Sequence, residues 1–291
     1  MSRRAATSIG FIAVLLWSLL GFLTVKSGAV PPLLLNAVCF GLGALVGGVW
    51  LSASGGWSEL RRVSFKVYVF GTAGFFGYHF LYFSALRMAP AAEAGLINYL
   101  WPLLVVLLSG LLPGETLRRG HILGALIAFA GAALIAGRGM QGAADWRTLL
   151  GYAMALAAAL FWAFYSVGSR RLGNVPTAAV TGYCLATALL SLGAHLALEE
   201  TAWPQGAFQW ASTILLGLGP VGLAFFVWDI GVKQGNIQLL GVASYAAPVL
   251  STCILVLGGV TEPSGALLIA AALITAGAAL AARASAKKGK L

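Results

Sequence analysis

The chain has 291 residues, of which 60% are hydrophobic and 9% are charged, and its formal net charge is +10. An average soluble domain carries about 25% charged residues, because polar side chains must cover its core in water. This composition excludes a soluble enzyme, a disordered tail and a disulfide-stapled secreted domain, and it predicts a protein whose apolar surface faces lipid.

The apolar residues fall into ten runs that are separated by short loops. A helix that crosses a bilayer needs about 20 mostly apolar residues, and its backbone groups must pair within the segment, so these runs indicate helices rather than a barrel. We therefore expect an all-α polytopic membrane protein with ten transmembrane helices and no soluble domain between them. In chain order the runs are residues 8–25, 33–53, 67–86, 91–112, 121–137, 149–168, 177–198, 210–232, 237–258 and 264–282.

The basic residues lie mostly in alternate loops, which is how membrane topology distributes them. With ten helices both termini share one side. That side carries fourteen of the 18 Lys and Arg residues, and the other side carries Lys26, Arg87, Arg138 and Arg147. The positive-inside rule then predicts that both termini are cytoplasmic, and we place the chain in a bacterial inner membrane. Because the charges follow the loops and form no basic groove, we expect no nucleic-acid partner.

The two halves of the chain repeat each other. Ala-Gly-Ala-Ala-Leu occurs at 130–134 and again at 276–280, a spacing of 146. Each half holds five predicted helices, an odd number, so the second half must cross the membrane with opposite polarity, as in many alternating-access transporters. We expect a 5+5 inverted-topology repeat with domains 1–142 and 143–291. Further matched pairs are Gly95 with Gly241, Tyr99 with Tyr245, Pro102 with Pro248, Arg87 with Lys233, Trp17 with Trp162 and Cys39 with Cys184.

Two aromatic stretches carry a resemblance to a known family. They are Tyr78-His79-Phe80-Leu81-Tyr82 and Asn98-Tyr99-Leu100-Trp101-Pro102, in the third and fourth runs. With ten helices, an inverted repeat and Gly/Ala-rich spans, the chain resembles the EamA-type branch of the drug/metabolite transporter superfamily over nearly its whole length. The aromatic stretches look like those of its bacterial aromatic amino acid exporters. The resemblance implies transport rather than catalysis.

Aromatic and polar side chains at mid-depth are the candidate substrate-binding residues, because repeat-built transporters bind substrate near the bilayer midplane. At a rise of 1.5 Å per residue, Tyr78 and His79 lie about 17 Å into the third run, near the middle of the bilayer core. A buried hydroxyl there needs a partner, so each tyrosine either lines a cavity or bonds across helices. The alternative for the tryptophans is helix packing, and His79 either bridges two helices or binds substrate or carries a proton. The candidates are Tyr78, His79, Tyr82, Asn98, Tyr99, Trp101, Trp162, Tyr245 and Trp17.

Matched prolines and glycines in the fourth and ninth runs are candidate kinks or gates. Pro102 and Pro248 each remove a backbone hydrogen bond, and Gly95 and Gly241 lie two turns earlier. A separate pair, Asp229 and Lys233, is spaced four residues apart near the predicted cytoplasmic end of the eighth run, where we expect an ion pair at the water boundary.

The absence of certain side chains at mid-depth excludes several classes of substrate. No Arg or Lys is available there to clamp a phosphate, and no carboxylate cluster to hold a polycation or metal ion. Cys39, Cys184 and Cys253 have no metal-ligand spacing, and His79, His121 and His195 belong to no catalytic motif, so we expect neither an enzyme nor a cofactor.

A small, largely apolar solute that is neutral or zwitterionic fits best, because aromatic side chains can stack on its ring and attract its ammonium group. The leading hypothesis is a transporter that exports aromatic or other hydrophobic amino acids and related metabolites by alternating access, with a monomer as the working expectation. The alternatives are a broad-specificity drug or metabolite exporter, a small-metabolite importer of the same superfamily and, less favoured, a channel.

Overall fold

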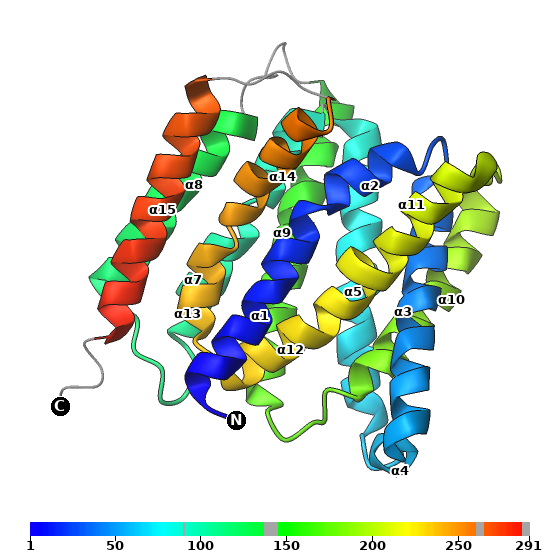
Figure 1. The fold of residues 1–291 in the computed structure, drawn as a ribbon, viewed down its shortest axis with the longest axis horizontal. Coiled ribbons are helices and arrows are strands. Elements are labelled where there is room, and N and C mark those ends of the chain that lie inside the picture. The colour runs from blue at the N-terminus through cyan, green and yellow to red at the C-terminus, as the bar shows by residue number, and fades with distance from the viewer. Residues whose placement is uncertain (90, 137–144, 260–264, 287–291) are drawn as a thin grey trace.

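The computed structural model describes residues 1–89, 91–136, 145–259 and 265–286, and these form a bundle of helices with no β-strand among them (Figure 1). The expected all-helical class is confirmed at this level. The predicted domain boundary at 142/143, the end of the fifth run at 137 and the start of the tenth at 264 lie outside the described residues.

Most predicted runs correspond to one helix or to two consecutive helices. The helices are α1 (Arg3–Ser18), α2 (Leu20–Lys26), α3 (Pro32–Ser54), α4 (Trp57–Leu60), α5 (Phe65–Met88), α6 (Ala91–Asn98), α7 (Trp101–Ser109), α8 (Arg119–Ala136), α9 (Trp146–Arg171), α10 (Ala179–Leu198), α11 (Gly206–Leu218), the π-helix η2 (Gly219–Leu223), α12 (Ala224–Gln234), α13 (Ile237–Ala243), α14 (Ala246–Leu257) and α15 (Gly265–Ala286).

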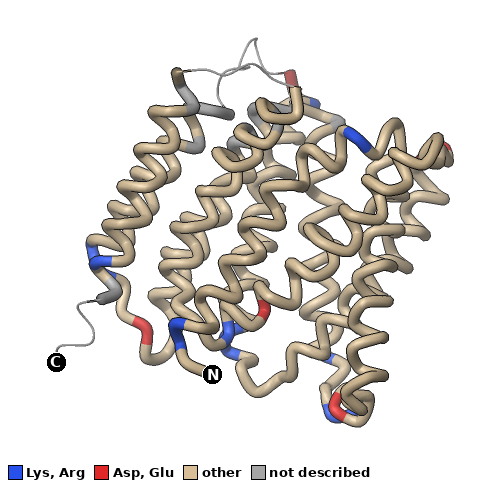
Figure 2. The backbone as a smooth tube through the Cα atoms, in the orientation of Figure 1, with Lys and Arg blue, Asp and Glu red and all other residues tan. Residues whose placement is uncertain are grey.

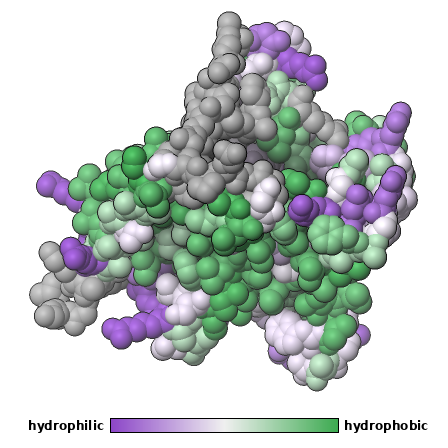
Figure 3. All heavy atoms as spheres, turned by 45° about the horizontal axis from the view of Figure 1, so that its top comes forward, coloured by the Kyte–Doolittle hydropathy of each residue, from purple (hydrophilic) through white to green (hydrophobic). Residues whose placement is uncertain are grey.

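Five helical segments of the described chain are long and apolar enough to cross a membrane: residues 3–26, 32–54, 146–171, 179–198 and 206–234. Shorter apolar helices accompany them. Large apolar side chains are exposed on the outside of the bundle, for example Leu196 at 72% and Leu268 at 75%, and Figure 3 shows apolar residues covering much of one face. Such surface is stable only against lipid, so the chain is a multi-pass membrane protein.

Several predicted spans are interrupted near their middle. The fourth run divides between α6 and α7, and the ninth divides between α13 and α14. The predicted kink residues explain both interruptions, because Pro102 and Pro248 lie in the first turns of α7 and α14, where a missing N–H costs little. The eighth run contains the π-helix around Pro220, and the first run is broken at Leu19.

Helices of the first half pack against helices of the second half. The closest pairs are α8 with α15, α3 with α10, α5 with α9 and α1 with α12 (Figure 1). Small residues allow the close approach of α1 and α12, since a Cβ on Gly10 would lie 2.7 Å from the Cα of Gly231. The core between these pairs is aromatic, with Phe75, Trp162 and Phe225 among its members.

Basic residues gather at the end of the bundle that holds the N-terminus, and we call it the basic end (Figure 2). Arg3 at the start of α1 binds Glu115 there, in the loop before α8. The end of α15 lies at the same end of the bundle, where Arg118 donates to the carbonyl oxygen of Ala284 (Figure 1). The start of α1 and the end of α15 therefore lie at the same end of the bundle, the basic end.

Candidate functional site

The candidate site is a cavity of about 290 Å³ at the helix interruptions. Its wall combines side chains from both halves of the chain. Aromatic rings dominate the wall, and among the described residues that line it there is no Asp, Glu, Lys or Arg. The lining residues are Trp17, Leu20, Gly21, Tyr78, His79, Tyr82, Asn98, Tyr99, Trp101, Trp162, Pro220, Val221, Phe225, Ser244, Ala247 and Ser251.

Eight of the nine candidate binding residues meet in this wall, although they come from four separate stretches of the chain. Three indoles form one side of it. The ring of Trp17 lies 5.9 Å from that of Trp101 and 5.8 Å from that of Trp162, in edge-to-face contacts. The Nε1 of Trp17 donates to the carbonyl oxygen of Pro220 at 3.1 Å, which fixes the orientation of this ring.

Tyrosines and an amide form the other side of the wall. The rings of Tyr78 and Tyr82 are stacked at 6.0 Å, as their spacing of four residues on α5 predicts. Asn98, the last residue of α6, donates from Nδ2 to the hydroxyl oxygen of Tyr78 at 3.1 Å. The Oδ1 of Asn98 is buried and has no hydrogen-bond partner in the described part of the chain.

His79 is buried in the wall with one ring nitrogen already used. Its Nδ1 lies 2.7 Å from the carbonyl oxygen of Phe75, an acceptor, so Nδ1 carries a hydrogen and the neutral ring keeps Nε2 as an acceptor. The ring also packs edge-to-face against Phe40 at 4.9 Å. The bond is to the same helix, so His79 does not form the hydrogen bond between two helices that was one interpretation of it, and its role in substrate binding or proton transfer stays a prediction.

Tyr245 lies outside the cavity wall, unlike Tyr99, the residue with which the 146-residue spacing pairs it. It is fully buried, and its hydroxyl accepts from the N–H of Leu103 at 3.1 Å. Leu103 is in the first turn of α7, where the N–H groups have no partner within their own helix. Tyr245 therefore supplies an acceptor for a free N–H group of α7. This is the hydrogen bond between helices that was the alternative to a cavity-lining role for Tyr245.

The matched glycines differ in their surroundings. A Cβ on Gly241 would lie 2.8 Å from Cγ2 of Val106 and 3.1 Å from the carbonyl oxygen of Pro102, so α13 packs tightly on α7. A Cβ on Gly95 would have only the Tyr82 hydroxyl within 4 Å, at 3.7 Å. A gating role for these residues stays a prediction.

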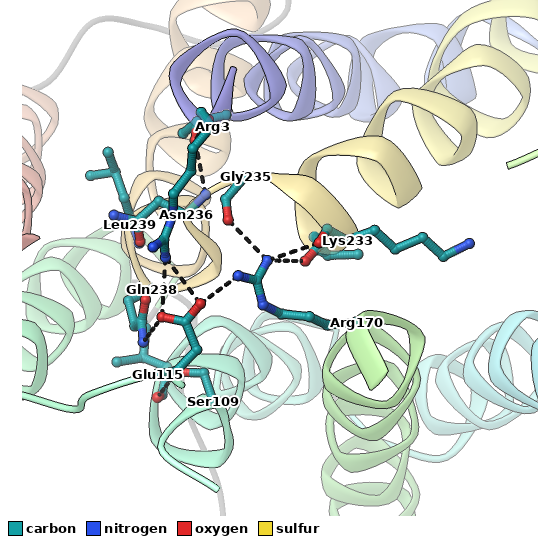
Figure 4. Close-up of polar contacts among 12 residues, drawn as sticks. Arg3, Ser109, Glu115, Arg170, Lys233, Gly235, Asn236, Gln238 and Leu239 are labelled. Atoms are coloured by element: carbon teal, nitrogen blue, oxygen red, sulfur yellow. Dashed lines mark hydrogen bonds and ion pairs between the residues drawn. The ribbon is translucent and has the colours of Figure 1, made fainter. Parts of the chain in front are cut away.

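A charged network that was not among the sequence predictions lies at the basic end (Figure 4). Glu115 accepts from Nη2 of Arg3 with both oxygens at 3.0 Å, pairs with Arg170 and accepts from Nε2 of Gln238 at 3.2 Å. Arg170 also donates to carbonyl oxygens at the end of α12, those of Val232, Lys233 and Gly235. One carboxylate and one guanidinium thus join α1, α9, α12, α13 and the loop before α8.

The carboxyl group of Glu115 is ionised across the neutral range. Its burial raises the pKa, but the charges of Arg170 and Arg3 outweigh that effect, and the pKa lies below its ordinary value of 4.5. The sequence signal that could have found this network is a lone acidic residue beside the basic residues of the 113–119 loop.

Asp229 and Lys233 form the expected ion pair at 2.8 Å, but the pair is buried rather than at the water boundary. Ser169 and Thr177 donate to the Asp229 carboxylate at 3.0 and 2.7 Å, and Lys233 also donates to the carbonyl oxygen of Val175 at 3.0 Å. In Figure 4 the Lys233 side chain extends away from Glu115, so only the carbonyl oxygen of Lys233, which accepts from Arg170, links the pair to the network. No group of three His, Cys, Asp or Glu side chains suited to a metal occurs in the described residues.

Comparisons with known proteins show which proteins the chain resembles. A model of the EamA-like transporter family matches residues 5–137 and 149–283. The chain is 53% identical to a protein of Ancylobacter novellus named aromatic amino acid exporter YddG, over 97% of this chain and 98% of the relative. It is 27% identical to a Salmonella typhimurium protein of the same name, over 87% and 88%. A solved structure titled only as the crystal structure of a protein superposes with a TM-score of 0.91 at 53% identity, covering 96% of this chain and 98% of that one.

Proposed function

Because the chain belongs to the EamA-like transporter family, we propose that it exports aromatic and other hydrophobic amino acids and related small metabolites across the membrane by alternating access. The observation that carries the proposal is the cavity wall, where aromatic rings meet and no described lining residue is charged. Rings of this kind can stack on an aromatic side chain and attract an ammonium group. The relatives named as aromatic amino acid exporters support the same substrate class.

We further infer the membrane arrangement. The helices are grouped as ten spans, five in residues 1–142 and five in 143–291, with opposite polarity. The packing of α1, α3, α5 and α8 each against a helix of the second half supports this grouping, as does the pair of matched helix interruptions. The positive-inside rule makes the basic end cytoplasmic, with both termini in the cytoplasm of a bacterial cell and one chain as the transporting unit.

In this arrangement substrate enters from the basic end, and the charged network of Glu115 and Arg170 is the contact that separates when the cavity opens to the cytoplasm. The interruptions near Pro102 and Pro248 lie beside the cavity residues Tyr99 and Ser244. A change of angle at these points therefore alters the wall. Gly95 leaves room for that change, and Gly241 lets α13 pack closely on α7. This is the role proposed for the four residues.

The test is uptake of labelled Phe, Trp and Tyr into proteoliposomes that contain the purified full-length protein. We expect saturable uptake, and an about three- to tenfold loss in Tyr99→Ala and in Trp101→Ala, because each ring contact contributes about 0.5–1.5 kcal/mol. Trp146→Ala is the matched control, since Trp146 is 73% exposed at the start of α9. Uptake no greater than in empty liposomes contradicts the proposed substrate class.

A broad-specificity exporter is the second candidate, and the uncharged wall favours it, because such a wall lacks a strong selector for one ligand charge. Competition for labelled Phe uptake by a panel of amino acids and hydrophobic dyes separates the two. Dyes that compete as well as Trp support the broad exporter. Net uptake into cells that express the protein would instead indicate an importer.

A further inference from the structure

One polar atom in the cavity wall is buried and has no hydrogen-bond partner among the described residues. Asn98 is only 5% exposed, and its Oδ1 has no hydrogen-bond partner in the described chain. The other half of the same amide is occupied, because Nδ2 donates to the Tyr78 hydroxyl at 3.1 Å. Buried polar atoms without a partner are rare in folded proteins, so each of them calls for an explanation.

Three donors of the cavity wall are committed to backbone carbonyls. Nδ1 of His79 donates to the carbonyl oxygen of Phe75, Nε1 of Trp17 donates to that of Pro220, and Oγ of Ser244 donates to that of Leu240 at 2.8 Å. None of these hydrogens is free to reach Asn98 without breaking a short bond. No described residue donates to Oδ1 of Asn98, so this oxygen is available to a donor that enters the cavity.

The chemistry of the unused atom selects which end of an amino acid it receives. An amide oxygen accepts hydrogen bonds and repels a carboxylate, whereas an ammonium group is a strong donor with three hydrogens. No Asp or Glu among the described lining residues competes for that ammonium. The stacked rings of Tyr78 and Tyr82 beside the amide add cation–π attraction.

The position that corresponds to Asn98 in the second half of the chain carries a different kind of group. Asn98 and Ser244 are 146 residues apart, the spacing that relates Tyr99 to Tyr245, and both line the cavity next to a helix interruption. The second copy carries a short hydroxyl that already donates to its own helix. The two halves therefore offer one unpaired amide oxygen between them.

We propose that Oδ1 of Asn98 receives the ammonium group of an amino-acid substrate, so that Asn98 sets the preference for amines over plain carboxylic acids. This assignment rests on the proposed function, because it assumes that an amino acid occupies the cavity.

The experiment compares three probes that share one ring: L-phenylalanine, 2-phenylethylamine, which lacks the carboxylate, and 3-phenylpropionate, which lacks the amine. Each competes with labelled Phe uptake into proteoliposomes of wild type, Asn98→Leu and Asn98→Asp. In Asn98→Leu we expect the apparent affinity for phenylalanine and phenylethylamine to fall about tenfold, while that for phenylpropionate is unchanged. Asn98→Asp keeps an acceptor and should retain the preference for both amines.

Thr187→Val is the matched control, because Thr187 also carries a buried unpaired oxygen but lies in α10, outside the cavity wall. It should keep the wild-type pattern. For a variant that transports poorly, binding of the three probes to the purified protein gives the same comparison. The readout is the increase in its thermal stability when each probe is added.

The outcomes distinguish a wrong assignment of Asn98 from a wrong proposed function. If wild type moves labelled Phe but Asn98→Leu keeps the wild-type ratio among the three probes, the assignment of Asn98 is wrong and the proposed function stands. If Asn98→Leu selectively loses phenylpropionate, the amide receives the carboxylate and the proposal is overturned. If wild type neither binds nor moves any aromatic amino acid, both fall together.

Discussion

The central cavity and the basic end solve the problem of buried polarity in opposite ways. The cavity is lined by neutral groups, and one amide oxygen in its wall is left without a partner. The basic end concentrates full charges, and Glu115 there is bonded to Arg3, Arg170 and Gln238. An acceptor atom without a partner is available to bind a ligand, whereas a charged group with several partners holds helices together.

The difference follows from where water can reach. A charge that loses its partners inside a bilayer pays a large desolvation cost, but a charge at the end of a bundle can be solvated when the bundle opens. Glu115 and Arg170 can therefore separate and reform in each transport cycle. The cavity, which changes occupants in every cycle, avoids that cost by staying neutral.

The largest effect tests the claim that a buried charge in this chain must be paired. Asp229→Ala leaves Lys233 buried without its carboxylate, and we expect it to lower the free energy of unfolding by about 3–5 kcal/mol. Thermal unfolding of the purified protein measures it. The double variant with Lys233→Ala should recover part of the loss, and no recovery would mean that Ser169 and Thr177 rather than the ion pair determine the effect.

The next effect tests the basic end as a contact that opens. Arg170→Ala removes the pair with Glu115 and the bonds to three carbonyls, so the end should open more often. The measurement is labelling of Ala247→Cys in the cavity wall, in a chain without its native cysteines, by an impermeant reagent added on the side of the N-terminus. We expect labelling about tenfold faster.

Arg171→Ala is the control for that experiment. Arg171 is the adjacent residue, is exposed and donates only to the carbonyl oxygen of Leu111 in the described chain. Equal labelling rates in the two variants would show that loss of positive charge, rather than loss of the Arg170 contacts, sets the rate.

The smallest effect is the pH dependence of the same network. The pKa of Glu115 is lower in the folded protein than its ordinary value of 4.5, so its stabilising contribution is present above that pH and is lost as the pH falls through the lowered pKa. Thermal unfolding of wild type and Glu115→Gln should differ by a constant amount from pH 7 to about pH 5, and the two should converge at lower pH. A difference that instead grows below pH 5 contradicts the assignment.

Periodicity and depth arguments recovered eight of the sixteen residues that line the cavity, because these arguments depend on local geometry. Tyr78 and Tyr82 share a helix face through their spacing, and their distance from the start of the run places them level with Asn98 and Tyr99 on the next span. The helix interruptions were also foreseeable from Pro102 and Pro248. Which side of each proline the break takes, and how α13 packs on α7, depend on contacts between distant residues.

Long-range partners are what the sequence could not reveal. Tyr245 and Tyr99 occupy the same place in their repeats, yet only a structure shows that the Tyr245 hydroxyl is used by Leu103, 142 residues away. Glu115 is likewise 112 residues from Arg3 and 55 from Arg170. Nothing in the spacing of these residues marks them as partners, because no helix or repeat relates their positions.

The Gly10–Gly231 contact gives α1 and α12 a bare crossing point. Backbone meets backbone there beside the Leu240 side chain, so a change in the angle between the two helices displaces few side chains. The crossing can act as a pivot: it lies midway along α1 and in the C-terminal half of α12, and the arms that carry Trp17 and Phe225 swing about it.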